Sequence, residues 1–489
     1  MIDTKALRKK ILELAFSGKL IPDSIHRDSS IELMNSIINE KKRLVNEKRI
    51  GKIKALAPIK EDEKVFPIPT TWIYSKLGDL TTPLSDGVHY APEYQQDGYK
   101  CFSAKDIYDN QINDSDCTYI TSEEYLGMKD KINVHEGSIL ITKSGSIGRS
   151  AIVKEYYEFG LVESIGVINL IIINPEYIKY VLDYGFVYSS YYLEKYTRGV
   201  GLKHLTLTLL ENIPIPLAPL AEQEYIVNML NKVFKLMDKI DILQQQYSSD
   251  LAILKGKIFD AGIRGKLTEQ LPEDGDAENL YSQIQKEKIE ILKIRGGRQD
   301  KSIKTEDEEK PFEIPSNWKW IRFGEVGLFK KGPFGSALTK SMFVPKTDDT
   351  VKIYEQQHAI KKDANLGNYY ISREYFESNM TGFEVKSGDI IVSCAGTIGE
   401  TYIMPPQLEQ GIINQALMRV TLVPSILNEF FLYYFDSNLK TDARNESNGM
   451  AIKNIPPFDV MKNWYFPLPP LAEQKRITKK IDELLQIIG

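Results

Sequence analysis

Apolar residues recur every three or four positions between residues 226 and 261. An average spacing of 3.5 residues predicts a long helix whose apolar seam packs against other helices along its length. We therefore expect a rod or spacer rather than a simple bundle helix. The series occupies positions 226, 230, 233, 237, 240, 247, 251, 254, 258 and 261, with Gln244 as its polar exception. Shorter parts of the same seam stand near the chain ends, at Leu7, Ile11 and Leu14, and at Ile477, Ile481, Leu484 and Ile488.

A second helical pattern follows each Gly-Lys-Leu sequence, at residues 31–50 and 277–296. Both segments carry runs of lysine, arginine and glutamate. We interpret these runs as solvated helix faces rather than as phosphate-binding surfaces. The Lys- and Glu-rich stretches that follow, 51–64 and 297–310, predict linkers.

Residues 65–218 and 311–469, here called module 1 and module 2, have a different pattern. Short β-like runs alternate there with Gly, Asn and Asp turns. Each module has a Gly-Ser/Thr-Ile-Gly turn after a strand, at 145–148 and at 396–399. A tight hairpin explains such a turn as well as a site of close backbone approach does.

The modules and their helices are two copies of one repeat. Fixed-period self-similarity identifies a repeated architecture, and four blocks in the same order exclude chance. The blocks are 219–223 and 470–474 (PLAEQ in both), 134–148 and 385–399, 64–80 and 310–326, and 7–20 and 254–267.

The order of these blocks is circular. The helix after the first PLAEQ continues into the counterpart of the N-terminus, whereas the helix after the second PLAEQ stops at Gly489. Residues 3–20 supply the continuation of the second helix. We therefore expect the second long helix to be divided between the chain ends, with only a counterpart of 239–249 missing. An antiparallel, pseudo-twofold pair of helical rods fits this arrangement.

Composition limits the class of protein. A chain of 489 residues predicts two or three domains, and 42% hydrophobic with 26% charged residues is ordinary for a soluble protein. We expect a cytoplasmic protein, because no apolar run could span a bilayer, no signal peptide is evident and the three cysteines have no metal-ligand spacing. A net charge of −5 neither indicates nor excludes nucleic-acid binding, which depends on a local surface.

No known catalytic motif is present. The sequence lacks GxxxxGK[ST], HExxH and GxSxG, and its histidines have no metal-ligand spacing. Residues 174–177, Asn-Pro-Glu-Tyr, resemble the NPP[YF] turn of amino-methyltransferases, but no glycine-rich S-adenosylmethionine loop precedes them. The second copy keeps only a strand, a proline and a helix at this place. We therefore predict a strand-to-helix corner, no catalytic residues and no metal site.

Taken together, these motifs resemble the specificity subunits of Type I restriction–modification systems. The resemblance covers the whole chain and is specific because the motifs occur twice in circular order. The motifs are PLAEQ before each long helix, the SGKL and RGKL turns, FPIPTTW and FEIPSNW, GSILITKSGSIG and GDIIVSCAGTIG, and the loops DGVHYAPEY and GPFGS.

The resemblance implies an α+β fold with two mixed α/β target-recognition domains, separated by long antiparallel coiled-coil helices. It also implies that the chain, without catalysis of its own, reads a bipartite double-stranded DNA site with one domain per half-site. Two modification (methyltransferase) subunits and restriction subunits would dock on it and use S-adenosylmethionine, ATP and magnesium, which this chain would not bind. The implied division is 1–60 (N-terminal helical region), 61–218 (first recognition domain), 219–305 (central helical region), 306–469 (second recognition domain) and 470–489 (C-terminal helix).

Polar loop residues are the candidates for DNA contact, because side chains that reach base edges read sequence while Lys and Arg on phosphates fix position. Each of them is equally compatible with an ordinary surface position. In module 1 they are Ser85, Asp86, His89, Lys105, Lys143, Ser144, Lys203 and His204. In module 2 they are Lys330, Lys331, Ser336, Lys340, His358, Ser393, Thr397 and Lys453.

Two alternatives remain. A single-chain modification enzyme would need a methyltransferase segment, but the two repeats already account for the chain. A scaffold that binds only protein partners through its helices would show no DNA sequence preference. The loops 83–94 and 330–343 diverge while their framework matches, which favours two readers of different ligands and is equally compatible with neutral drift.

Overall fold

The computed structural model describes the chain except for residues 23–24, 26–28, 198–202, 297–309, 396 and 447–454. Contacts divide it into two compact units, residues 1–246 and residues 247–489. The division falls within one helix of 44 residues, α7 (Leu220–Ile263), which confirms the predicted long helix. Each unit combines one module with helices, so the predicted α+β class is also confirmed.

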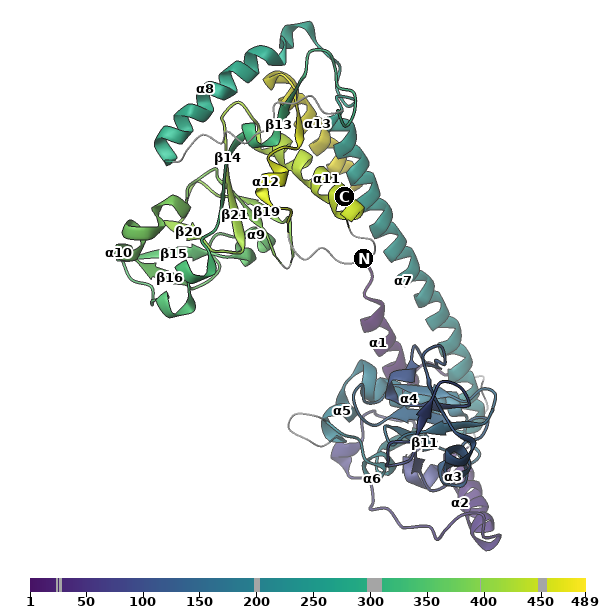
Figure 1. Ribbon diagram of the computed structural model, residues 1–489. Coiled ribbons are helices and arrows are strands. Elements are labelled where there is room, and N and C mark those ends of the chain that lie inside the picture. Colours follow the sequence, from purple (N-terminus) through teal and green to yellow (C-terminus); the bar gives the residue numbers. More distant parts are fainter. Residues whose placement is uncertain (23–24, 26–28, 198–202, 297–309, 396, 447–454) are drawn as a thin grey trace. The chain divides into compact units, whose positions relative to one another are not determined.

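Unit 1 combines module 1 with two N-terminal helices and the first part of α7 (Figure 1). Its helices are α1 (Thr4–Phe16) and α2 (Ser30–Asn46) and, within module 1, α3 (Ser122–Ile132), α4 (Pro175–Asp183), α5 (Tyr191–Lys195) and α6 (Leu207–Glu211). Its strands are β1 (Ile73–Lys76), β2 (Ser85–Asp86), β3 (Tyr94–Gln95), β4 (Tyr99–Phe102), β5 (Ile107–Tyr108), β6 (Gln111–Ile112), β7 (Thr118–Ile120), β8 (Ile139–Thr142), β9 (Ser150–Ile152), β10 (Phe159–Leu161), β11 (Ile165–Ile168) and β12 (Pro214–Leu217).

Unit 2 repeats this plan around module 2. Its helices are α8 (Ala277–Arg295), α9 (Gln356–Lys361), α10 (Arg373–Tyr375), α11 (Asn428–Glu446), α12 (Phe458–Met461) and α13 (Leu471–Ile488). Its strands are β13 (Lys319–Arg322), β14 (Gly327–Lys331), β15 (Thr350–Tyr354), β16 (Tyr370–Ser372), β17 (Glu384–Val385), β18 (Ile390–Ser393), β19 (Thr401–Ile403), β20 (Gly411–Ile413), β21 (Leu417–Leu422) and β22 (Tyr465–Leu468).

The sheets of the two modules correspond except at one edge. Module 1 has an antiparallel sheet in the order β2-β11-β8-β9, and module 2 has β14-β21-β18-β19. A second sheet shares three strands, β10-β4-β7 in module 1 and β20-β15-β16 in module 2, and each begins with one parallel pair. The edges of this sheet differ, because β3 pairs with β7 in module 1, whereas module 2 has an isolated antiparallel bridge there, between Val344 and Tyr370, and pairs β17 with β20 instead. The repeat therefore preserves the framework and varies at an edge.

A buried tryptophan–glutamate hydrogen bond fastens each module to the helix that follows it. Trp72, at the start of module 1, donates from Nε1 to Glu222 Oε2 at 2.7 Å, and Trp318 donates to Glu473 Oε2 at 2.7 Å. Both carboxylates are buried, so the glutamate of PLAEQ does more than meet the positive end of a helix. The next residue, Gln223, accepts from the backbone N–H of Asn174 at 3.1 Å.

The Gly-Lys-Leu turns end the long helices against the start of each module. Gly18 and Gly265 both have φ of +69°, a conformation that favours glycine. A Cβ atom would lie 2.3 Å from Pro69 Cγ at Gly18, and 2.5 Å from Pro315 Cγ at Gly265. This close packing explains why the turn and the proline of the module start recur together.

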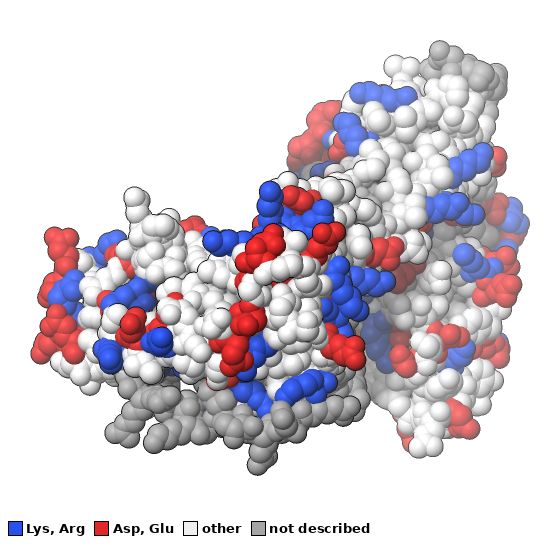
Figure 2. Space-filling model, turned by 90° about the horizontal axis from the view of Figure 1, so that it is seen from above, with Lys and Arg blue, Asp and Glu red and all other residues white. Residues whose placement is uncertain are grey.

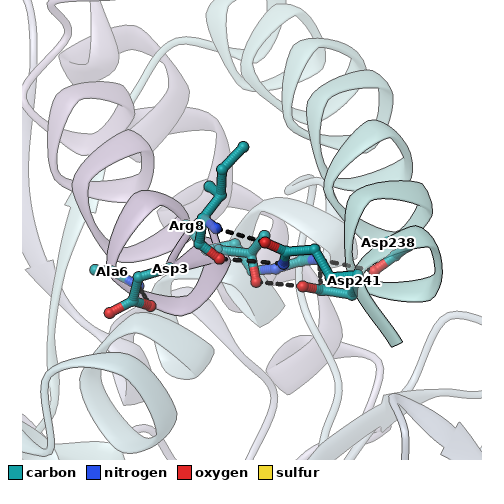
Figure 3. Close-up of polar contacts among 8 residues, drawn as sticks. Asp3, Ala6, Arg8, Asp238 and Asp241 are labelled. Atoms are coloured by element: carbon teal, nitrogen blue, oxygen red, sulfur yellow. Dashed lines mark hydrogen bonds and ion pairs between the residues drawn. The ribbon is translucent and has the colours of Figure 1, made fainter. Parts of the chain in front are cut away.

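In unit 1 the N-terminal helix α1 runs antiparallel to α7. Arg8 Nη2 lies 2.8 Å from Asp238 Oδ1 and 3.1 Å from Asp241 Oδ2, and the Thr4 hydroxyl donates to Asp241 Oδ1 at 2.5 Å (Figure 3). Later residues of α1 thus meet earlier residues of α7. The Thr4 and Arg8 hydrogen bonds lower the pKa of Asp241. These contacts support the predicted placement of the N-terminus beside the long helix.

In unit 2 the C-terminal helix α13 also runs antiparallel to α7. A Cβ on Gly262 would meet Ile481 Cδ1 at 2.9 Å, whereas Gly489 lies near Tyr247. Ile477 and Ile481 are fully buried, as predicted. The circular repeat is therefore confirmed, because each chain end packs on α7 within its own unit.

The predicted seams are buried only in part. On α7, Ile226 and Leu230 are fully buried, whereas Tyr247 is 59% exposed near the middle of the helix. The predicted α1 seam is wrong at Leu7, which is 41% exposed, because Thr4 and Arg8 are on the face that meets α7. A three-and-four spacing identifies a helix but leaves the buried face ambiguous by one residue.

Two lysines correct the prediction of solvated basic runs. Lys41 of α2 is buried and donates to the carbonyl oxygens of Gly78 and Asp79 at 2.8 and 3.2 Å. Lys288 of α8 is buried and donates to the Gly324 carbonyl at 2.6 Å. These equivalent lysines fasten the second helix of each unit to its module, and burial lowers the pKa of Lys41.

Candidate nucleic-acid interface

A polar cluster joins four of the predicted residues of module 1. Lys143, buried after β8, forms an ion pair with Asp86 of β2. His89 Nε2 lies 3.2 Å from the other Asp86 oxygen. Glu163, in the turn between β10 and β11, lies 3.5 Å from His89 Nδ1 and 3.8 Å from His204 Nε2. The resulting chain of charged and titratable side chains runs from the buried Lys143 to the exposed histidines.

The exposed part of this cluster can exchange hydrogen bonds with a ligand. The side chains of His89, Glu163 and His204 are 63%, 44% and 41% exposed. Imidazole can donate or accept, and carboxylate accepts, which are the functions needed at base edges. The ion pair of Asp86 with the buried Lys143 holds the end of β2, and His89 lies in the loop that follows. Glu163 was not predicted. It follows β10, and the parallel pairing of β10 with β4 cannot be recognised from sequence spacing.

The remaining candidates of module 1 lie outside this cluster. Ser85 turns inward and donates to the Ile132 carbonyl at 2.9 Å. Lys105 is exposed and donates to the Asp116 carbonyl at 2.9 Å. Lys203 is exposed and Ser144 is half-buried in the turn after β8.

Residues 145–148 of module 1, and residues 397–399 of module 2, lie in hairpin turns; Gly396 lies outside the described residues. In module 1, Thr142 Oγ1 donates to the Ser146 carbonyl at 2.5 Å and accepts from the Arg149 N–H at 3.0 Å. Ser393 repeats both bonds in module 2, with the Thr397 carbonyl at 2.5 Å and the Glu400 N–H at 3.0 Å. Ser393 is fully buried in these contacts, whereas Thr397 is exposed at the turn.

Module 2 presents most of its candidates to solvent. Lys330 lies over the Phe383 ring, with its Nζ 4.6 Å from the centroid. His358 differs, because it is fully buried and its Nε2 lies 2.6 Å from the Leu366 carbonyl. Its ring thus holds the turn after α9 and offers no exposed atom. Lys453 lies outside the described residues. The exposed candidates are Lys330, Lys331, Ser336, Lys340 and Thr397.

The two modules differ in chemistry at equivalent positions. Lys143 donates its N–H to the Ser164 carbonyl at 2.8 Å, and Cys394 donates to the Ala416 carbonyl at 2.8 Å in the same place. The edge strand of the same sheet is β2 in module 1 and β14 in module 2. These strands carry Asp86 and Lys331 at matching register.

An ion pair in one module therefore corresponds to a lysine beside a buried thiol in the other. Burial raises the pKa of Cys394 to about 11, and the nearby Lys331 opposes this increase.

Acidic and basic side chains are intermixed on the face seen in Figure 2. Within the described part of the chain, no group of His, Cys, Asp and Glu has the geometry of a metal site. Among the same residues, no helix is both long and apolar enough to cross a membrane. The predicted strand-to-helix corner is present, since Asn174 caps α4 by accepting from the Glu176 N–H at 2.9 Å.

Comparisons with known proteins agree with the repeated architecture. Residues 69–246 and 315–488 each match the family described as Type I restriction modification DNA specificity domain. The chain is 24% identical to the Type I restriction enzyme EcoEI specificity subunit and 26% identical to the EcoAI specificity subunit, both of Escherichia coli. Each alignment covers 99% of this chain and 89% of the relative.

A solved structure supports the fold. It concerns complex assembly and conformational transition of the type I restriction–modification system, and one of its chains aligns with a TM-score of 0.53 at 16% identity. The alignment covers 86% of this chain and 91% of that chain.

Proposed function

Because the chain belongs to the family of Type I restriction–modification DNA specificity subunits, we propose that it reads a bipartite DNA target, with one module for each half-site. The chain is a specificity subunit and not the catalytic component. The observation that carries the proposal is the pair of equivalent faces, in which one framework holds Asp86 and Lys143 in module 1 but Lys331 and Cys394 in module 2. Identical readers would need no such difference.

In this proposal the helices dock two modification subunits, and restriction subunits join that core. Apolar side chains of α7 remain available for docking, since Leu236 and Leu243 are 58% and 62% exposed. Clusters of exposed apolar residues are typical of protein interfaces. The partner subunits supply the chemistry of S-adenosylmethionine, ATP and magnesium, and this chain binds none of these cofactors.

Each module grips DNA through two kinds of contact. Exposed lysines such as Lys203 and Lys340 position phosphates, and the exposed histidines and serines meet base edges. The chain carries a net charge of −5. We therefore expect weak binding by the chain alone and tight binding only when the modification subunits add basic surface.

The test is methylome sequencing of a host that carries the chain with its modification subunits, followed by footprinting of the purified complex. We expect one methylated motif with two specified parts and an unread spacer. Exchange of residues 65–218 for a homologous module should change only one part. A complex without sequence preference would leave the scaffold that binds only protein, and a change in both parts or in neither would contradict the modular assignment.

A further inference from the structure

A glycine stands at the same place in both modules, directly after the strand at the edge of the first sheet. Gly87 follows β2 and donates its N–H to the Ile165 carbonyl at 3.2 Å. Gly332 follows β14 and donates to the Leu417 carbonyl at 2.9 Å. Ile165 and Leu417 are themselves equivalent, because they pair with Thr142 and Ser393 of the hairpin turns.

Neither glycine has room for a side chain. A Cβ on Gly87 would lie 2.3 Å from the Leu161 carbonyl oxygen, and one on Gly332 would lie 1.8 Å from the Asn414 carbonyl oxygen. The backbone therefore passes directly against the framework at both places. This contact fixes the position of the residues that come next.

The two residues after each glycine alternate inward and outward. Val88 is 6% exposed and Pro333 is buried, so both anchor the loop. The next residue projects into solvent, which is His89 in module 1 and Phe334 in module 2. The two loops thus present one side chain each from the same register, on a backbone that the glycine holds in place.

Phe334 is exposed to an unusual degree. It is 89% exposed, and among the large apolar side chains of the described residues only Met1 is more exposed. A phenyl ring left in water loses the free energy that burial would provide. Exposed lysines and a serine surround it in sequence, at Lys331, Ser336 and Lys340. Lysines of this kind can contact DNA phosphates. An apolar side chain among them is therefore better suited to contact the edge of a base than an apolar protein surface.

We infer that Phe334 is a specificity-determining residue that contacts a thymine 5-methyl group in the half-site of module 2, and that His89 reads the other half-site through hydrogen bonds from the same register. The inference rests on the proposed function. The thymine methyl is the apolar group that the major groove presents, and Phe is among the side chains that contact it. Insertion of the ring between bases would instead require the bases to unstack.

The test uses the full chain in complex with its modification subunits, and duplexes that carry the methylated motif. In one duplex, deoxyuridine replaces every thymine of the module 2 half-site, which removes only methyl groups. We expect this replacement to weaken binding of the unaltered complex about fivefold to tenfold, the size of one lost apolar contact. Phe334→Ala should lose the same factor on the thymine duplex and lose nothing further on the deoxyuridine duplex.

Two further variants complete the design. Ile360→Ala removes another partly exposed apolar side chain of module 2, and should leave both affinities unchanged. His89→Ala should weaken discrimination in the module 1 half-site and leave the effect of deoxyuridine intact.

Three outcomes would overturn the inference while the bipartite motif stands. They are a module 2 half-site without thymine, normal binding by Phe334→Ala, or equal loss from deoxyuridine with and without the ring. Equal losses in both proteins would indicate an effect of DNA shape, and loss from Phe334→Ala alone would indicate insertion between bases. Absence of any bipartite motif would contradict the proposed function instead.

Discussion

The two modules share their attachment to the helices and differ on the face that carries the candidate residues. Trp72 with Glu222 and Trp318 with Glu473 form the same buried bond at 2.7 Å. By contrast, the position of Lys143 in module 1 holds Cys394 in module 2. Contacts that recur in both copies therefore identify the scaffold. Side chains that differ on that scaffold identify the places where each copy meets its own ligand.

The scaffold itself is unequal at one point. Glu473 accepts not only from Trp318 but also from Gln270 at 2.6 Å and Thr268 at 3.1 Å. In unit 1, Glu222 Oε1 has no hydrogen-bond partner within the described part of the chain. Loss of the carboxylate should therefore disturb unit 2 more than unit 1.

The largest expected effect comes from removing these carboxylates. Glu473→Ala leaves three donors without an acceptor and should reduce the free energy of unfolding of unit 2 by about 3–4 kcal/mol, whereas Glu222→Ala should cost unit 1 about 2 kcal/mol. Urea unfolding followed by hydrogen exchange in each unit measures both values. Glu224→Ala, at an exposed position of α7, is the control and should change little. Equal losses in the two units would contradict the difference in partners.

The glycine turns should respond alike. Gly18→Ala and Gly265→Ala place a Cβ in a left-handed conformation and against a proline ring, so each should destabilise its unit by about 2 kcal/mol. Gly256→Ala is a matched control within α7, where an added Cβ meets no atom within 4 Å. That substitution should stabilise the helix by about 0.5–1 kcal/mol. Thermal unfolding distinguishes the three variants, and a tolerated Gly18→Ala would show that the proline contact is not restrictive.

The ion pair of module 1 should be transferable to the equivalent positions of module 2. Cys394→Lys buries an ammonium beside Lys331 and should destabilise unit 2. Lys331→Asp, combined with it, restores the ion pair that Lys143 and Asp86 form in module 1. A double-mutant cycle should give a favourable coupling of about 1–2 kcal/mol. Additive effects in the cycle would mean that the two positions are not equivalent.

The smallest expected effect is a pH dependence of the contacts that hold α1 in unit 1 and α13 in unit 2. The Thr4 and Arg8 bonds lower the pKa of Asp241 in unit 1, and the Arg476 bond lowers the pKa of Asp274 in unit 2. A lowered carboxyl pKa stabilises the folded state above the ordinary value, and this contribution is lost as pH falls through the folded value. Hydrogen exchange of α1, corrected for its intrinsic pH dependence, should therefore increase modestly between pH 5 and about pH 3.

Asp241→Asn distinguishes the pH dependence of α1 from that of α13. It should remove the pH dependence of exchange in α1 and leave that of α13 unchanged. An unchanged profile in α1 would assign its pH dependence to other groups.

Much of the fold could be predicted because each sequence block occurs in two copies. Blocks in circular order predicted that the chain ends would lie beside the long helix, and α1 and α13 confirm this. The buried lysines could not be predicted in the same way. Lys41 stands in a charged run that predicts solvent exposure, and its acceptors at Gly78 and Asp79 are distant in sequence.

Four candidate residues of module 1 lie together, but the surroundings of each candidate could not be predicted from the sequence. Asp86, His89, Lys143 and His204 do gather, because turns of one sheet bring their loops together. Histidine is a residue type that often contacts ligands from loops, yet His358 is fully buried by the packing of the fold. Phe334 escaped prediction for the opposite reason, since an apolar side chain is ordinarily assigned to a core. Sequence patterns report the average behaviour of a residue type, and both residues depart from that average.

The tryptophan–glutamate bond also bears on how such genes can change. Trp72 enters with module 1, whereas its acceptor Glu222 belongs to the helix beyond the module. A recombination event that replaces 65–218 would thus bring the tryptophan donor with the new module, and the glutamate acceptor would already be present in the helix. Because Trp318 and Glu473 form the same bond, either location could accept a donor module that begins with this tryptophan. New specificity could then arise by exchange of whole modules, without refitting the helices that hold them.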